Sequence, residues 1–341
     1  MLSYDLSLAD AAVIDSQYPT QRLFRDMLIR LGLKTVTTYG SFQEAATLLA
    51  AATPDLVLID ADGEDGEAFR FVRSLRNEPG TPNPYTCLIA TTWQPTPTLL
   101  LRVTNSGVDD LMVKPVSPKQ VQDRIVTLIE NRKSFVVTAD FTGPDRRKSP
   151  REGAAVPLID VPNTLRLKAT GKWTAAGLRL AMQQANVRVN EQKRLRASIQ
   201  AAFLVEFAAT GLTGGQPDRM ALEHLSRVPV IVDELLRRLP EGNDGTSAVA
   251  NACRSLKDGV ERLRSIADSG SFAGAGEEVS RVRAVAQALM EAVDPARAPE
   301  ALTAEVATAV AGYRSRLEQM ARAKLAESAR AAAPEAAGPA V

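Results

Sequence analysis

The chain has 341 residues, of which 45% are hydrophobic and 24% charged, and its formal net charge is +1. This composition predicts a globular protein long enough for two domains, and the even charge balance gives no argument for nucleic acid or an acidic substrate. Two distant cysteines, Cys87 and Cys253, indicate neither a disulfide framework nor a metal cluster. Together with the lack of a long apolar stretch, they favour a soluble, cytoplasmic protein.

Short apolar segments alternate with amphipathic segments through residues 9–132. The apolar segments predict five strands, at residues 11–14, 35–38, 55–60, 87–91 and 111–113. A helix is expected after each strand, and the last is best marked, because Ser117 and Gln120 form a capping-box pattern around Pro118. Strands that alternate with helices in this way predict a doubly wound five-stranded parallel sheet, an α/β fold.

Three charged residues stand at the ends of predicted strands. Asp60 closes the uninterrupted apolar run that begins at Leu56, Asp15 follows the first strand, and Lys114 follows the fifth. Ligands of open α/β sheets collect at the carboxyl ends of the strands. Two carboxylates with a lysine suit a divalent cation and a phosphoryl group. An acid at a strand end is also a common loop or cap residue, and this simpler interpretation applies to Asp109 and Asp110.

The pattern resembles the receiver domain of two-component response regulators, a flavodoxin-like fold. The resemblance covers residues 9–132 and is carried by Asp15, Asp60, Thr92 and the segment from Gly107 to Pro115. It implies that Asp60 is the phosphoacceptor for a histidine kinase or phosphotransfer protein and that Asp15 and Asp60 hold Mg²⁺. It also implies that Thr92 and Lys114 bind the phosphoryl group.

Three departures from the family pattern modify these expectations. Ser16 stands where the family usually has a second acid, so Mg²⁺ binding is expected to be weak unless Asp62 or another acid of the next loop compensates. That loop, which follows Asp60, is short and lacks the usual proline. Leu111 replaces the usual aromatic switch residue, and Trp93 is a candidate to take over that role.

Residues 133–173 lose periodic patterning and are rich in proline and glycine, which predicts an extended linker. The segment from Phe135 to Lys148 resembles an extension found after receivers in alphaproteobacterial regulators. Phe135, Val137 and Phe141 alternate, which favours docking on a sheet edge or on the second domain.

The remaining sequence is rich in Ala, Leu, Arg and Glu and predicts a helical bundle over residues 174–328, followed by a disordered tail at 329–341. Helices are expected near residues 174–210, 218–239, 246–269, 277–293 and 299–328. Leu178, Met182, Ala185 and Val189 have coiled-coil spacing, which fits either core packing or a homodimer seam. Pro229 is expected to kink the second helix.

Two motifs in the helical half bear on its function. His224 is the only histidine, which excludes a histidine-rich metal site, and its helix predicts a surface position. The segment from Arg254 to Gly259 faintly resembles the histidine-bearing helix of phosphotransfer domains, with Arg254 at the histidine position. This resemblance implies at most a degenerate bundle that docks a partner without carrying phosphate.

The sequence therefore predicts a response regulator in which phosphorylation of Asp60 controls a helical, protein-binding output module, without enzymatic activity or a membrane partner. One alternative is a pseudo-receiver that docks proteins without phosphorylation. Another is a DNA-binding transcriptional regulator, which the interleaved acids and the lack of a helix-turn-helix pattern disfavour.

Overall fold

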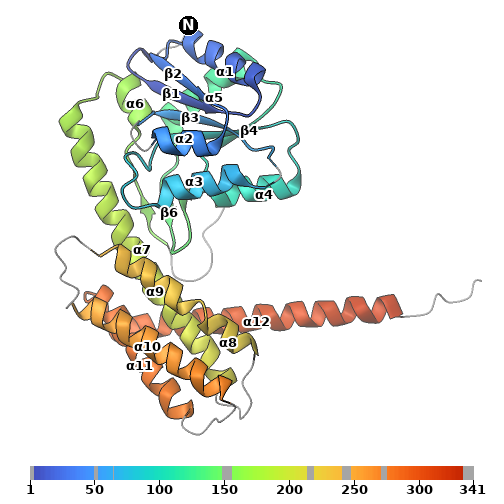
Figure 1. Ribbon diagram of the computed structural model, residues 1–341, viewed down its shortest axis with the longest axis vertical. Coiled ribbons are helices and arrows are strands. Elements are labelled where there is room, and N and C mark those ends of the chain that lie inside the picture. The colour runs from blue at the N-terminus through green and yellow to red at the C-terminus, as the bar shows by residue number, and fades with distance from the viewer. Residues whose placement is uncertain are drawn as a thin grey trace, which may run out of the picture. The chain divides into compact units, whose positions relative to one another are not determined.

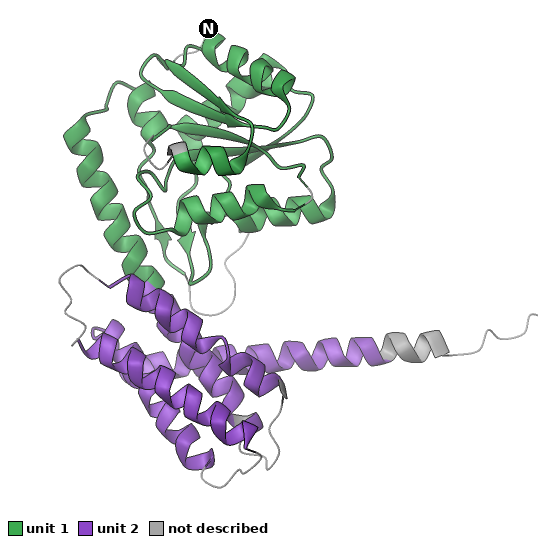
Figure 2. Cartoon of the chain, viewed as in Figure 1, with its two compact units in different colours: residues 1–193 green, residues 194–341 purple. Residues whose placement is uncertain are grey.

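The computed structural model describes residues 4–49, 53–63, 65–147, 156–212, 219–239, 247–269 and 275–332. The chain forms two compact units, residues 1–193 and 194–341, which are coloured separately in Figure 2. The division falls within one long helix, α7 (Ala175–Leu212). The helical half was expected to begin at residue 174, and α7 begins at the next residue, Ala175. The division between the two units therefore lies inside the first helix of the predicted helical half.

Unit 1 is built on a five-stranded parallel sheet with strand order β2-β1-β3-β4-β5 (Figure 1). The strands are β1 (Asp10–Ile14), β2 (Thr35–Tyr39), β3 (Leu56–Asp60), β4 (Cys87–Thr92) and β5 (Asp110–Val113). The flanking helices are α1 (Tyr18–Arg30), α2 (Phe42–Leu49), α3 (Glu67–Asn77), α4 (Pro97–Ser106) and α5 (Pro118–Asn131). The predicted doubly wound fold is therefore confirmed.

The apolar run of β3 is buried on both faces of the sheet. Leu56 and Leu58 pack in one core with residues of α1 and α5, and Val57 and Ile59 pack in the other with residues of α2, α3 and α4. Successive residues of a strand point to opposite faces, so a strand covered by helices on both sides needs apolar residues throughout. The first residue of β3 that is not fully buried is Asp60, at the open carboxyl edge.

The predicted start of α5 is also confirmed. Ser117 accepts a hydrogen bond from the Gln120 backbone N–H (3.3 Å), and the Gln120 side chain accepts one from the Ser117 backbone N–H (2.7 Å). This capping box fixes where α5 begins, immediately after Lys114 and Pro115 leave the sheet.

The prediction of an extended linker after α5 is wrong in the part of that segment that the structure describes. Its residues form an antiparallel sheet, with order β7-β6-β8, and a short helix. These elements are β6 (Phe135–Val137), β7 (Thr142–Pro144), β8 (Leu158–Ile159) and α6 (Thr164–Ala169). The strands are two or three residues long and pair across a long loop, so periodicity in the sequence could not reveal them.

The small sheet packs on the first half of α7. Phe135 and Val137 are fully buried and form a core with Tyr85, Ala185 and Val189. The alternation of Phe135 and Val137 therefore reflects docking, as expected. Met182 also packs against this core. The regular spacing along this part of α7 serves core packing, and the homodimer stays a prediction.

A buried ion network joins the small sheet to the receiver-like fold at the amino end of β5. The Asp109 carboxylate lies 2.9 Å from Arg76 Nη2 and 2.8 Å from Arg132 Nε, and all three side chains are at most 5% exposed. Asp109 also accepts a hydrogen bond from the Leu88 backbone N–H at 2.8 Å. The Phe135 ring lies 5.2 Å from the Arg76 guanidinium and 5.1 Å from that of Arg132. Asp109, expected to be a turn residue, is thus a central element of the core.

Gly107, which ends α4, lies against the backbone of β7 and leads to a stability prediction. Its φ is +99°, and a Cβ there would lie 2.6 Å from the Thr142 carbonyl oxygen, whereas Gly32 has the same φ and open space. We expect Gly32→Ala to cost about 1–2 kcal/mol for the left-handed conformation. Gly107→Ala should cost about 1–3 kcal/mol more, because backbone atoms must also move.

Urea unfolding followed by tryptophan fluorescence measures this difference, because Trp93 and Trp173, the two tryptophans of the chain, both lie in unit 1. An equal loss in the free energy of unfolding for the two glycine variants would show that the backbone at Thr142 can move away from the added Cβ without a measurable loss of stability.

Unit 2 is helical, as predicted. Its described residues form the end of α7 and five further helices, α8 (Arg219–Leu225), α9 (Val228–Arg237), α10 (Ala248–Asp268), α11 (Ala275–Val293) and α12 (Pro299–Ala332). The predicted kink at Pro229 is wrong, because the helix is interrupted by a turn at Ser226 and Arg227. Pro229 lies in the first turn of α9, where a backbone N–H has no partner within the helix, so the N–H that proline lacks is not needed. The disordered tail predicted from residue 329 is wrong at its start, because α12 continues to Ala332, and from residue 333 on it lies outside the described residues.

The two motifs of the helical half have packing roles. His224 is half-buried in an aromatic cluster, with its ring 4.7 Å from that of Phe207, which is 5.1 Å from that of Tyr313. Gly259 lets α10 approach α11, because a Cβ there would lie 2.7 Å from a Val282 methyl group. Arg254 is exposed on α10. None of the described helices is both long enough and apolar enough to cross a membrane.

Candidate functional site

The structure brings the predicted strand-end residues together at the carboxyl edge of the parallel sheet. Asp15 follows β1, Asp60 ends β3 and Lys114 follows β5. Lys114 Nζ lies 2.7 Å from Asp60 Oδ1 and 3.6 Å from Asp15 Oδ2. The side chains of Lys114 and Asp15 are 3% and 2% exposed, whereas that of Asp60 is 16% exposed. Asp60 is thus the carboxylate of this pair that is more open to a reactant.

A third carboxylate, that of Asp62, also faces Lys114, at 3.2 Å from Nζ. The Thr92 hydroxyl donates a hydrogen bond to Asp62 Oδ1, and the Trp93 backbone N–H donates one to Oδ2 at 2.8 Å. From the sequence, Asp62 was expected only as a possible substitute for the acid that Ser16 replaces. Its position two residues after Asp60 places it near the site, but the sequence of a loop has no periodicity that predicts where a side chain points.

Thr92 and Trp93 lie at the end of β4, beside these carboxylates. Thr92 is fully buried, and its hydroxyl also accepts a hydrogen bond from the Gln94 backbone N–H at 3.0 Å. The Trp93 side chain is half-exposed, and its ring lies 5.3 Å from Lys114 Nζ. Leu111 lies apart from this group, packed against the core beneath α4. Of the two predicted switch residues, Trp93 is the one that contacts the site.

The electrostatics of the cluster favour a cation. Burial raises the pKa of Asp60, and the nearby Lys114 ammonium opposes this effect. Burial acts in the same direction on Asp62, but hydrogen bonds from Thr92 and Trp93 outweigh it and lower the pKa of that carboxyl. Burial disfavours the charged form of Lys114, yet the surrounding carboxylates raise its pKa overall. One ammonium faces three carboxyl groups, so the cluster carries more negative than positive charge.

The residues at this edge fit a bound Mg²⁺. Asp15 Oδ2 is buried without a hydrogen-bond partner, and Asp60 is partly open, so two carboxylates have oxygens available to a hard cation. Ser16 is exposed and brings no charge. Over the described ranges, no three His, Cys, Asp or Glu side chains converge in a metal-binding arrangement. Waters and backbone carbonyls would have to complete the coordination shell.

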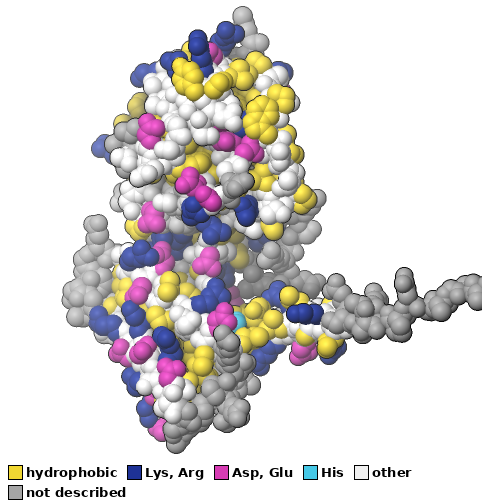
Figure 3. Space-filling model, turned by 45° about the vertical axis from the view of Figure 1, so that its right-hand side comes forward, with side chains coloured by type: hydrophobic (Ala, Val, Ile, Leu, Met, Phe, Trp, Pro, Cys, Tyr) yellow, Lys and Arg dark blue, Asp and Glu magenta, His cyan; other side chains and the backbone are white. Residues whose placement is uncertain are grey.

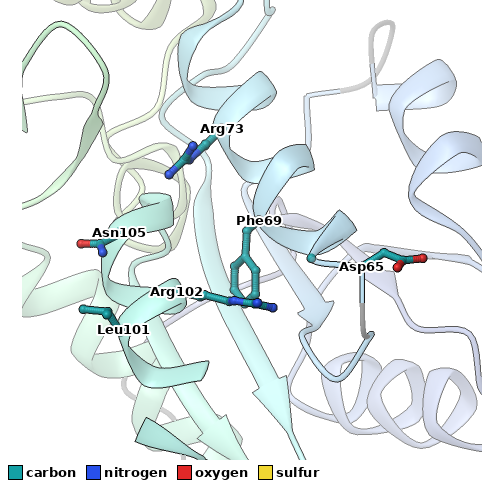
Figure 4. Close-up of a pocket in the computed structure, with 7 residues that line it drawn as sticks. Asp65, Phe69, Arg73, Leu101, Arg102 and Asn105 are labelled. Carbon is teal, nitrogen blue, oxygen red and sulfur yellow. The ribbon is translucent and has the colours of Figure 1, made fainter. Parts of the chain in front are cut away.

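Two cavities adjoin the site. One, of about 460 Å³, is lined by residues of the loops after β3 and β4, including Asp62, Gly63 and Trp93. The other, of about 310 Å³, lies between α3 and α4, and Figure 4 shows Phe69, Arg73 and Asn105 around it. The first cavity is lined by Asp62 of the charged cluster, whereas the residues that line the second do not belong to that cluster.

Comparisons with known proteins agree with this geometry. Residues 11–126 match the family described as "Response regulator receiver domain". A stretch of 129 residues is 30% identical to the hybrid signal transduction histidine kinase D of Dictyostelium discoideum. The match covers 36% of this chain. The chain spans 8% of the length of that relative.

Solved structures that resemble the chain include the chemotaxis protein CheY4 of Vibrio cholerae, with 19% identity and a TM-score of 0.32, covering 35% of this chain and 97% of that one. A response regulator of Desulfuromonas acetoxidans has 20% identity and a TM-score of 0.32, covering 36% and 98%. The family match, the sheet and the strand-end cluster all concern the same part of the sequence. Residues 11–126 are a response regulator receiver domain.

Proposed function

We propose that the chain is a cytoplasmic two-component response regulator in which phosphorylation of Asp60 controls a helical output module that binds protein. The observation that carries the proposal is the position of Lys114 between the carboxylates of Asp15 and Asp60 at the open edge of the sheet. A receiver domain implies a histidine kinase or phosphotransfer protein as partner. The ground for the proposed alphaproteobacterial type is the sequence resemblance of the segment from Phe135 to Lys148.

In the proposed reaction, an Asp60 oxygen forms a bond to the phosphorus atom of a phosphohistidine on the partner. The P–N bond of the donor breaks, its electron pair returns to the imidazole, and Asp60 becomes an acyl phosphate. Asp60 is consumed once per event, so the chain is not an enzyme in this proposal. Lys114 offsets the charge of the phosphoryl group, and the Thr92 hydroxyl donates a hydrogen bond to it.

Asp15 and Asp60 would hold Mg²⁺ in this site. When bound, the ion supplies positive charge that offsets the repulsion between a carboxylate nucleophile and a phosphoryl dianion. The protein contributes the fixed positions of the groups around it, which the sheet register determines.

Mass spectrometry of the intact chain tests the proposal. Incubation with acetyl phosphate and Mg²⁺ is expected to add one phosphoryl group that is stable in acid and labile in base. Chelation of Mg²⁺ should slow the reaction at least about tenfold. No gain of mass at any Mg²⁺ concentration would contradict the proposal.

One observation favours a second candidate, a pseudo-receiver that docks proteins without phosphorylation. Ser16 replaces an acid, and Asp62 already contacts Lys114 and Thr92. The same mass measurement separates the candidates, because a pseudo-receiver gains no phosphoryl group.

Protein rather than DNA is the proposed target of the helical unit. Basic side chains on its helices are paired with acids, as in Lys257–Asp233 (2.6 Å) and Arg283–Glu206 (2.6 Å). Figure 3 shows basic and acidic side chains intermixed over the described helices of unit 2 in that view. DNA binding requires a face on which basic residues predominate.

A further inference from the structure

The side chain of Asp62 occupies the hydrogen-bond donors that surround Asp60. One carboxylate oxygen accepts from the Thr92 hydroxyl, the other accepts from the Trp93 backbone N–H (2.8 Å), and Lys114 Nζ lies 3.2 Å away. Lys114 Nζ also lies 2.7 Å from Asp60 Oδ1, so the carboxylates of Asp60 and Asp62 share this ammonium group. Asp62 is therefore bound where a group attached to Asp60 would find its partners.

A phosphoryl group on Asp60 and the carboxylate of Asp62 need the same donors. A hydroxyl and a backbone N–H each have a single proton to donate, so neither can satisfy both acceptors fully. The two groups are also both negative, and like charges that share one lysine disfavour each other. The argument rests on the proposed function, because it takes Asp60 as the phosphoacceptor.

We propose that Asp62 is a positioning residue that holds Thr92, Trp93 and Lys114 in the unphosphorylated chain and is displaced when Asp60 is phosphorylated. Thr92 is already drawn to the site by a carboxylate. The change on phosphorylation is then the release of Asp62 and its loop, rather than an inward movement of Thr92. Asp62 opposes occupation of the site by a phosphoryl group.

The structure gives Asp62 room to leave. Its side chain is 25% exposed and lies at the wall of the cavity of about 460 Å³ next to Trp93. At the following residue, Gly63, no atom of the described residues outside its chain neighbours lies within 4 Å of the position of a Cβ, so the loop has open space on that side. A displaced carboxylate can therefore reach water through the cavity.

Binding of beryllium fluoride with Mg²⁺ tests this role without requiring a transfer reaction. The full-length chain carrying Trp173→Phe keeps Trp93 as its sole tryptophan, and the fluorescence of that residue reports occupation of the site. Asp62→Asn is expected to bind the phosphoryl mimic about tenfold more tightly than the parent, because a competing charge next to Lys114 is removed. Acetyl phosphate should also phosphorylate it faster.

Asp65→Asn is the matched control. It removes the same charge from the same loop, but the contact of Asp65 with Arg70 is made by its backbone carbonyl, which accepts a hydrogen bond from the guanidinium and is kept in the variant. Its affinity for beryllium fluoride should equal that of the parent. Asp62→Asn loses the ionic contact with Lys114, so its urea midpoint is expected to fall. A purely structural effect of that loss would weaken the binding of beryllium fluoride, whereas competition predicts tighter binding.

Three outcomes would overturn the inference. Equal affinities of the parent and Asp62→Asn would leave Asp60 as a working phosphoacceptor but remove Asp62 from its control. Weaker binding by Asp62→Asn would make Asp62 a metal ligand rather than a competitor. Failure of both proteins to bind, with no phosphorylation of either, would overturn the proposed function as well.

Discussion

Replacement of Asp60 by Asn is expected to abolish phosphorylation of the chain by acetyl phosphate and Mg²⁺. The amide keeps the size of the side chain but lacks the negative oxygen that attacks phosphorus and binds the cation. The other carboxylates of the cluster cannot substitute for it, because Asp15 is 2% exposed and Asp62 is engaged by Thr92 and Trp93. Intact mass, followed over time, measures the effect.

The variant should remain folded, which makes its loss of phosphorylation interpretable. Burial raises the pKa of Asp60 in the folded chain. An acid whose folded pKa lies above its unfolded pKa destabilises the fold once pH exceeds both values, so the neutral amide is expected to be at least as stable at pH 7. Asp65→Asn is the charge-matched control and should be phosphorylated at the parent rate. Equal phosphorylation of Asp60→Asn and the parent would refute the assignment.

Asp109→Asn should cause a large loss of stability in unit 1. The carboxylate is buried with Arg76 and Arg132, and burial lowers the pKa of Arg76 to about 10 even beside this acid. Removing the negative charge leaves two buried guanidinium groups without a counter-ion, and breaking such a pair costs about 3–5 kcal/mol. The small sheet should loosen with it, because Phe135 packs between the two arginines.

Asp110→Asn is the natural control, one residue further along β5. Its partner Arg124 is 48% exposed and Asp110 is 22% exposed, and exposed pairs contribute about 0–1 kcal/mol. Urea unfolding followed by tryptophan fluorescence compares the two variants in unit 1. Similar losses for Asp109→Asn and Asp110→Asn would show that the buried network is not a main source of stability.

The sheet and three of its strand-end residues could be predicted from the sequence. Asp15, Asp60 and Lys114 each follow an apolar run, and in a parallel sheet the carboxyl ends of such runs meet at one edge. Asp62 could not be placed in the same way. It lies in a loop, and its orientation depends on Thr92 and Trp93, which are about thirty residues away in the sequence.

The small sheet and the role of Asp109 escaped prediction for a related reason. β6 and β8 pair over a separation of more than twenty residues, and the alternation of Phe135 and Val137 is too short to distinguish a strand from an extended segment. Asp109 precedes a strand, which is typical of a turn residue, and only the folded chain reveals Arg76 and Arg132 on either side of it. Long-range ionic contacts leave no local pattern.

In the helical unit, the positions of most helices could be predicted from the sequence, whereas the roles of individual residues in them could not. The breaks between α9, α10 and α11 fall where the sequence has proline and glycine, as expected, in segments that lie outside the described residues. The phosphotransfer-like segment from Arg254 to Gly259 proves to include a packing glycine against Val282, and this contact accounts for Gly259 without a signalling role. The target of the helical unit is a matter for binding experiments.

Chemical mapping of the phosphorylated residue tests the central claim most directly. Borohydride reduces the acyl phosphate of an aspartate to homoserine, which peptide mass spectrometry locates in the chain. After reaction of the full-length protein with acetyl phosphate and Mg²⁺, we expect homoserine at position 60 and nowhere else. Homoserine at another acid, such as Asp15 or Asp62, or at none, would contradict the assignment of Asp60 as the phosphoacceptor.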